Sequence, residues 1–147
     1  MTTASTITTH EAQIRQLIAD QQQAICTKNV DQIMSRYTAK VIIFDVIPPF
    51  QTKGKAAIRQ TWEACLPCFP DSFEMETRDL TIIVNDNLAV AHWLFRFTAQ
   101  EDHPAMQTWM RVTAVCQKHQ DNWQIVHEHL SVPFDPETSQ AAFTLNP

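Results

Sequence analysis

Two histidines one residue apart, His127 and His129, are the first residues in this chain whose types and spacing suggest chemistry. They lie in the segment WQIVHEHLSVPF, residues 123–134, which has the composition of a β-strand. Side chains alternate between the two faces of a strand, so both imidazole rings point to the same side. Zinc needs a third or fourth ligand, and no acidic residue or cysteine joins this face on the neighbouring segments. We therefore expect no metal site, and interpret the pair as groups that hydrogen-bond across an interface or to nearby backbone.

Four cysteines raise a second possibility, because Cys65-Leu-Pro-Cys68 has the C-x-x-C spacing of redox and zinc sites. A redox site needs this motif at the start of a helix, where the helix dipole favours thiolates. Here the motif ends a predicted helix, with Pro67 as the stop. Cys26 and Cys116 are isolated, so a second pair of zinc ligands is missing and we interpret all four as ordinary thiols.

Length and charge limit the possible partners. With 147 residues we expect one domain over 1–147, with a core at about 8–134 and a polar tail at 135–147. The net charge is −5 and the eleven Lys and Arg residues are scattered, which argues against nucleic acid or an anionic membrane as a partner. The N-terminus has no signal-peptide pattern, and no apolar run is long enough to span a membrane. We expect a cytoplasmic protein.

The hydrophobic pattern predicts helices in the first half of the chain and strands in the second. Helical periodicity is found from Thr8 to Ile25, at 30–37 and at 55–66, and a β-branched run at 41–47 predicts one strand among these helices. Four later strands are predicted at 73–84, 88–99, 106–118 and 123–132. This order is typical of an α+β fold in which helices lie over one face of a curved antiparallel sheet.

Three motifs carry a resemblance to a known family: GKAAIR at 54–59, RVT at 111–113 and WQIVHEHLS at 123–131. Together with the helix–helix–strand start, they resemble the SnoaL-like group of the nuclear transport factor 2-like superfamily, over roughly residues 8–134. The last motif is also similar to the end of the association domain of calcium/calmodulin-dependent protein kinase II. The resemblance implies a cone-shaped, cystatin-like fold, whose sheet surrounds a pocket that three helices close. It also implies homodimers or larger rings joined through the outer face of the sheet.

The resemblance also suggests which face of the late strands points inward. Alternation divides these strands into two faces that are both too apolar to be simply solvated. By similarity to the isomerase-like members, the predicted pocket residues are Gln21, Trp62, His92, Leu94, Arg96, Val112, Glu128 and Leu130, together with Asp45. The more aromatic face is the predicted dimer interface, with Trp93, Phe95, Trp109, Arg111, His127 and His129.

Two functions remain open, because members of this superfamily include ketosteroid isomerase and polyketide cyclases as well as binding modules. We rank first a pocket protein that binds a small apolar or carboxylate-bearing molecule, with Arg96 holding the carboxylate. The second is a cofactor-free enzyme of the isomerase, lyase or cyclase type. In it Asp45, which matches the general base of ketosteroid isomerases, or Glu128 abstracts a proton. Gln21 corresponds roughly to the isomerase's tyrosine on the first helix, so steroid isomerisation itself is not expected.

The ionisable residues of the predicted pocket also have a purely structural interpretation. Burying an unpaired charge is costly, so Arg96 could pair with Glu128 and His92 with Asp45 without any further role.

Overall fold

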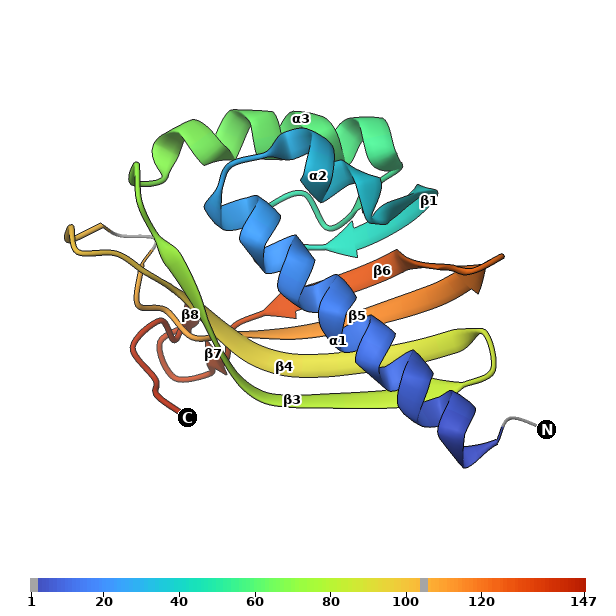
Figure 1. Ribbon diagram of the computed structural model, residues 1–147. Coiled ribbons are helices and arrows are strands. Elements are labelled where there is room, and N and C mark those ends of the chain that lie inside the picture. The colour runs from blue at the N-terminus through green and yellow to red at the C-terminus, as the bar shows by residue number, and fades with distance from the viewer. Residues whose placement is uncertain (1–2, 104–105) are drawn as a thin grey trace.

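The computed structural model describes residues 3–103 and 106–147, and in this part of the chain three α-helices pack along a curved six-stranded sheet (Figure 1). The helices are α1 (Ala4–Cys26), α2 (Val30–Ser35) and α3 (Lys55–Cys65), and the 3-10 turn η1 (Leu66–Cys68) follows α3. The strands of the sheet are β1 (Tyr37–Phe44), β2 (Thr52–Lys53), β3 (Glu74–Asn85), β4 (Leu88–Thr98), β5 (Met110–His119) and β6 (Asn122–Ser131). A hairpin of β7 (Phe134–Asp135) and β8 (Gln140–Ala141) comes last.

The strand order is β2-β1-β6-β5-β4-β3, and β3 to β6 form an antiparallel meander. The chain leaves β1, passes through α3 to β3 at the far edge of the sheet, and returns strand by strand to β6 beside β1. As a result β1 and β6 run parallel, with Ile42 opposite His127. The predicted α+β class and curved sheet with three helices are confirmed, but the sheet is mixed rather than purely antiparallel.

Helix α1 crosses the sheet diagonally (Figure 1). It begins four residues before the predicted Thr8 start, because the Thr3 hydroxyl caps it and accepts a hydrogen bond from the Thr6 N–H at 3.3 Å. Its buried residues recur at helical spacing and include Ile14, Ile18 and Gln21. The buried face of α1 therefore contains the polar amide of Gln21 as well as apolar side chains. Although α1 has 23 residues, no helix in the described part of the chain is long and apolar enough to cross a bilayer.

The first strand begins earlier than the sequence suggests. Tyr37, predicted as the end of the second helix, is the first residue of β1, and the strand ends at Phe44 rather than at Ile47. The chain then forms a loop that contains a cis peptide bond between Pro48 and Pro49. It turns into α3 at Gly54, whose φ of +84° suits the only glycine in the chain.

A β-bulge in β6 changes which side chains share a face. Ile125 lies opposite Cys116 and His127 opposite the adjacent Val115, so β6 has one extra residue, Val126, at this point. Ile125 therefore points to the same side as Glu128, although strict alternation would place them on opposite faces.

Candidate functional site

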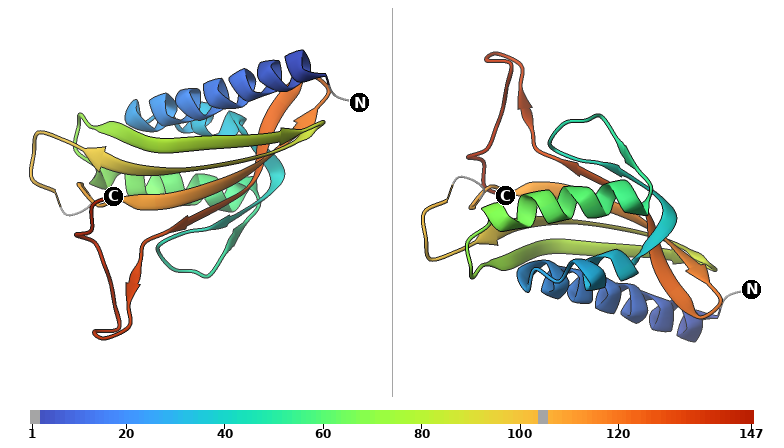
Figure 2. Two further views of the ribbon diagram at one scale, coloured as in Figure 1. Left: turned by 90° about the horizontal axis from the view of Figure 1, so that it is seen from below. Right: turned by 90° about the horizontal axis from the view of Figure 1, so that it is seen from above.

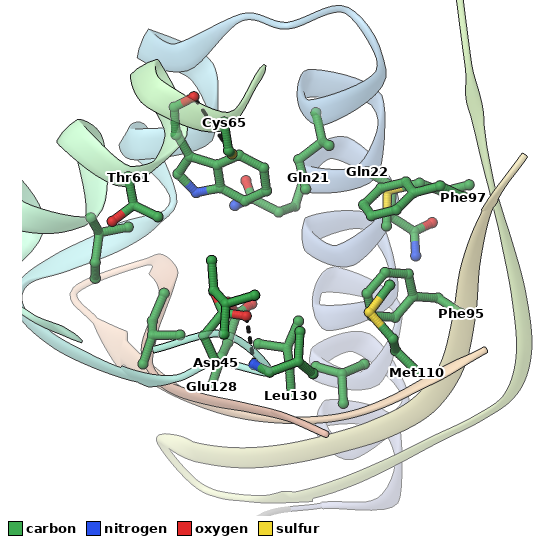
Figure 3. Close-up of a pocket in the computed structure, with 18 of the residues that line it drawn as sticks. Gln21, Gln22, Asp45, Thr61, Cys65, Phe95, Phe97, Met110, Glu128 and Leu130 are labelled. Carbon is green, nitrogen blue, oxygen red and sulfur yellow. Dashed lines mark hydrogen bonds between the residues drawn. The ribbon is translucent and has the colours of Figure 1, made fainter. Parts of the chain in front are cut away.

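The helices and the sheet enclose a cavity of about 360 Å³ (Figure 3). This volume is within the range of small-molecule sites, which is roughly 300–1,000 Å³. Most of its lining is apolar, and none of the described residues that line it is a lysine, arginine or histidine. Its main polar side chains are those of Gln21, Gln22, Tyr37, Asp45, Thr52, Thr61, Cys65, Thr108 and Glu128.

Glu128 on β6 is the most deeply placed charge-bearing group of the cavity. Its carboxylate Oε2 accepts a hydrogen bond from the Tyr37 hydroxyl at 2.8 Å. Burial raises the pKa of Glu128 from its ordinary value of 4.5 to about 7; the Tyr37 hydrogen bond opposes this rise and the negative charge of Asp45 adds to it. Glu128 therefore exchanges its proton near neutral pH, where a general acid or base is most useful.

Tyr37 keeps its proton in this arrangement. Burial, and then the charge of Glu128, raise the pKa of the Tyr37 phenol well above its ordinary value. The hydroxyl is therefore a hydrogen-bond donor to Glu128 over the working pH range. Sequence reasoning missed this residue, because the pattern at 30–37 suggested a helix. Tyr37, Val41 and Ile43 are all buried, but a register irregularity between Tyr37 and Ile42 breaks the alternation that could have linked them in the sequence.

Asp45 lies directly after β1 and is the second acid of the cavity. Figure 3 shows it beside Glu128 on the same side of the cavity. Its Oδ1 accepts a hydrogen bond from the Val46 N–H at 2.7 Å. Burial raises the pKa of Asp45, and the backbone N–H groups of Val46 and Ile47 oppose the rise. Two acids whose charges repel in one apolar cavity do not lose their protons together, so one can hold a proton while the other is ionised.

The helices contribute amides and an indole to the same cavity. Gln21 on α1 is buried, and its amide interacts with the Tyr37 hydroxyl, which lowers the pKa of Tyr37 against the larger rise from burial. Its neighbour Gln22 donates instead to the Thr77 hydroxyl at 2.8 Å. Trp62 on α3 is half-buried, and its carbonyl accepts the Cys65 thiol at 3.7 Å. Gln21 and Trp62 therefore both line the cavity.

The predicted inward face of β4 is wrong by one residue. His92 is exposed and Leu94 and Arg96 are half-buried on the outer side of the sheet, and none of the three lines the cavity. Trp93 and Phe95, predicted as interface residues, line the cavity instead, as does Phe97. The inward face of this strand is apolar, and the meander register places Trp93 beside Val112, which also lines the cavity. Leu130 lines the cavity as well.

Arg96 belongs to an outer cluster rather than to the pocket. Its guanidinium pairs with Glu76 at 2.7 Å and lies 4.9 Å from the centre of the Trp109 ring. Arg78 approaches the same indole at 4.7 Å. Trp109 is buried, and the guanidinium groups of both arginines lie over its ring.

The two predicted structural pairs are also wrong. Arg96 bonds to Glu76 rather than to Glu128, whose partner is the Tyr37 hydroxyl. His92 lies on the outer side of the sheet, whereas Asp45 lines the cavity. The two carboxyl groups of the cavity therefore have no cationic partner among its described lining residues.

The paired histidines do lie outside the cavity. His127 is half-buried, and its Nδ1–H donates to the Ile42 carbonyl at 2.8 Å. The edge of Phe44 packs on both rings, with centroid distances of 4.7 Å to His127 and 5.5 Å to His129. Arg111 is exposed on the same side, where its Nε donates to the Ser131 hydroxyl at 3.0 Å. Among the described residues, no three His, Cys, Asp or Glu side chains gather closely enough to hold a metal ion.

The fold and the cavity together define an α+β protein in which helices and a curved sheet surround an acid-containing, small-molecule-sized pocket. The model of the SnoaL-like domain matches residues 14–135, so this chain belongs to the SnoaL-like family. No curated protein matches the chain.

Solved structures place the family in its wider fold group. A protein of unknown function from Pseudomonas putida, described as nuclear transport factor 2-like, is 36% identical, covers 95% of this chain and 98% of its own, and superposes with a TM-score of 0.88. A candidate scytalone dehydratase from Novosphingobium aromaticivorans is 13% identical, with 87% of each chain covered and a TM-score of 0.75. A candidate ketosteroid isomerase from Parabacteroides distasonis is 18% identical, covers 78% of this chain and 83% of its own, and has a TM-score of 0.64. The last two likenesses concern the fold alone.

Proposed function

We propose that the cavity binds a small, uncharged and mostly apolar molecule, and that Asp45 and Glu128 exchange a proton with it without a cofactor. The observation that carries this proposal is the pair of carboxyl groups that face one apolar cavity, both with raised pKa values. Purely structural carboxyl groups are normally paired with a cation or kept at the surface. Two of the solved structures are named as a dehydratase and an isomerase, and these names are consistent with an enzymatic role for the cavity.

The two acids would have different roles. Glu128 is fully buried and feels the charge of Asp45, so Glu128 is the acid that keeps its proton longer. Ionised Asp45 would abstract a proton from the carbon next to a carbonyl group. The electrons of the broken C–H bond would move toward the carbonyl oxygen, which takes the proton of Glu128. Tyr37 would hold the Glu128 carboxylate in place after that transfer, through its 2.8 Å hydrogen bond.

The charge of the ligand follows from what lines the cavity. A carboxylate-bearing ligand was one expectation, with Arg96 as its partner, but Arg96 lies on the outer side of the sheet. An anionic ligand would meet Asp45 and Glu128 with no cation among the described lining residues to compensate. An uncharged ligand avoids this cost.

Binding without reaction is the second candidate function, and one observation favours it. Both carboxyl groups already have a partner in the protein: Glu128 accepts from the Tyr37 hydroxyl and Asp45 from the Val46 N–H. Groups satisfied in this way could serve only to shape a binding pocket.

The exchange of ligand protons with deuterium separates the two functions. The probe is 1-tetralone, a neutral bicyclic ketone, whose loss of α-proton signals in deuterated buffer is followed by NMR. Binding is followed separately by tryptophan fluorescence, since Trp62 and Trp93 line the cavity. We expect the wild type to accelerate exchange, and Asp45→Asn to reduce that acceleration about 100-fold or more, as is typical for removal of a general base.

The matched control is Glu74→Gln, which neutralises an exposed glutamate at the start of β3 and should leave the rate unchanged. Binding of the ketone with no exchange above the buffer rate would reject catalysis and support the binding function. Failure of the wild type to bind 1-tetralone would count against the proposed ligand class.

We also propose that two copies of the chain associate through the outer face of the sheet. Trp93 and Phe95, which were predicted to belong to this surface, line the cavity instead. Exposed apolar groups remain on it or at its edges: Phe44 is 37% exposed and lies against the exposed His129. Surfaces that combine aromatic, histidine and arginine side chains in this way are suited to association.

A further inference from the structure

We infer that Phe143 is a wall of the cavity that closes its mouth on a bound ligand and limits the size of that ligand. Phe143 lies two residues after β8, in the C-terminal segment at 142–147. The inference rests on the proposed function, because it requires a ligand in the cavity.

The C-terminal hairpin holds Phe143 in place. In this hairpin Phe134 pairs with Ala141, and the Ala142 N–H donates to the Pro133 carbonyl at 2.7 Å. Pro133 lies two residues after the end of β6, the strand that carries Glu128, and Val132 between them lines the cavity. The hairpin therefore ties the chain next to Phe143 to the end of the strand that forms the cavity floor.

Phe143 both lines the cavity and is exposed to solvent. Its side chain lines the cavity, yet the residue is 57% exposed. It thus contacts the cavity from its rim and has solvent on its other side. Two other apolar residues of the C-terminal segment, Phe134 and Leu145, are similarly exposed at 64% and 56% but do not line the cavity. Exposure of apolar side chains is general in this tail, whereas contact with the cavity distinguishes Phe143.

A second apolar segment borders the same cavity. Val46 and Ile47, in the loop between β1 and β2, also line it and are 39% and 51% exposed. In Figure 2 this loop and the β7–β8 hairpin project from the same side of the molecule, away from α1. Apolar side chains from two distant segments thus border one opening, and a neutral apolar molecule seated there would remove part of each from water.

Two effects on binding follow from this geometry. A ligand that fits inside the cavity gains the contact with the Phe143 ring, and loss of that contact should weaken binding about tenfold, as expected for removing part of a buried phenylalanine surface. A longer ligand would collide with the Phe143 ring. Removal of the ring should therefore not weaken the binding of the longer ligand, and should provide space for it.

The test compares two uncharged ketones, 1-tetralone and the four-ring 4-androstene-3,17-dione, by fluorescence titration of the full chain. We expect Phe143→Ala to weaken 1-tetralone binding about tenfold and to leave the four-ring ketone unweakened or bound more tightly. Leu145→Ala removes a similarly exposed side chain of the same tail, and should leave both affinities within about twofold of the wild type.

The outcomes separate this inference from the proposed function. If the wild type binds 1-tetralone but Phe143→Ala behaves like Leu145→Ala, the role of Phe143 is wrong while the proposed function stands. The role is also wrong if Phe143→Ala changes the sedimentation of the protein rather than the preference between the two ketones, because Phe143 would then be a contact between chains. If the wild type binds neither ketone, both proposals fall together.

Discussion

Replacing Glu128 by glutamine should change how the stability of the protein depends on pH. Glutamine keeps the size of the side chain and an oxygen that accepts the Tyr37 hydroxyl, but it cannot ionise. In the wild type the folded protein holds the Glu128 proton more tightly than the unfolded chain does, because the carboxyl group is buried in an apolar cavity beside Asp45. Between the two pKa values the folded state therefore binds more protons, and the free energy of unfolding falls as the pH rises.

The size of the effect follows from the two pKa values. A rise from the ordinary value of 4.5 to about 7 corresponds to roughly 3 kcal/mol, at about 1.4 kcal/mol for each tenfold change in proton affinity. The wild type has the full contribution of Glu128 below pH 4.5, and loses it progressively until the pH exceeds about 7. About 2.5 kcal/mol of the change falls between pH 5 and pH 8. Asp45 shifts in the same direction, so the wild-type curve alone is not diagnostic, but the difference between wild type and Glu128→Gln isolates Glu128.

The assay is urea unfolding followed by tryptophan fluorescence, at several pH values between about 5 and 8. We expect Glu128→Gln to gain about 2.5 kcal/mol relative to the wild type across this range, and Glu74→Gln, on an exposed residue, to follow the wild type. The reasoning is refuted if the difference between wild type and Glu128→Gln is the same at both ends of the range. Glu128 would then ionise as it does in the unfolded chain, and would not be buried in the cavity.

Two further predictions concern the outer side of the sheet. Arg96→Ala removes the pair with Glu76 and one cover of Trp109, so we expect a loss of about 1–2 kcal/mol in urea unfolding but ketone binding within about twofold of the wild type. A loss of binding much larger than this would mean that Arg96 reaches the cavity. His129→Glu adds a negative charge to the proposed pairing surface of both copies, and should shift the protein toward monomer in sedimentation velocity experiments. Unchanged association of this variant would place any contact between copies elsewhere.

Local patterns predicted most of the secondary structure. The strand expected at 88–99 is β4, Leu88–Thr98, and that expected at 123–132 is β6, Asn122–Ser131. These hairpins have strong alternation and short polar turns, which single sequences encode well. The start of β1 was missed because the apolar residues at 30–37 have helical spacing. In the structure Tyr37 instead pairs with Ile125 of β6 and so belongs to the sheet. Non-local pairing overrode the local pattern there.

The candidate site could be predicted only in part. Asp45 and Glu128 do face one cavity, with Gln21, Trp62, Val112 and Leu130. The face of β4 was misassigned because the prediction followed the isomerase-like members. The alternation itself marks the outside, since His92, Arg96 and Thr98 alternate with the buried Trp93, Phe95 and Phe97. The bulge in β6 adds an ambiguity, because one extra residue reverses the alternation of the side chains. No feature of the sequence at Val126 predicts this bulge.

The hydrogen bond between Tyr37 and Glu128 joins residues that are 91 positions apart, on strands that pair in parallel. Pairing of such distant segments is slow in folding, because the long intervening chain must first be ordered. During synthesis β1 is made early, but it must wait for β6 before it has a partner on that side of the sheet. The acidic centre of the cavity is therefore completed only when β6 pairs with β1. A chain cut before β6 would leave the backbone N–H and C=O groups on that side of β1 unpaired and would lack Glu128.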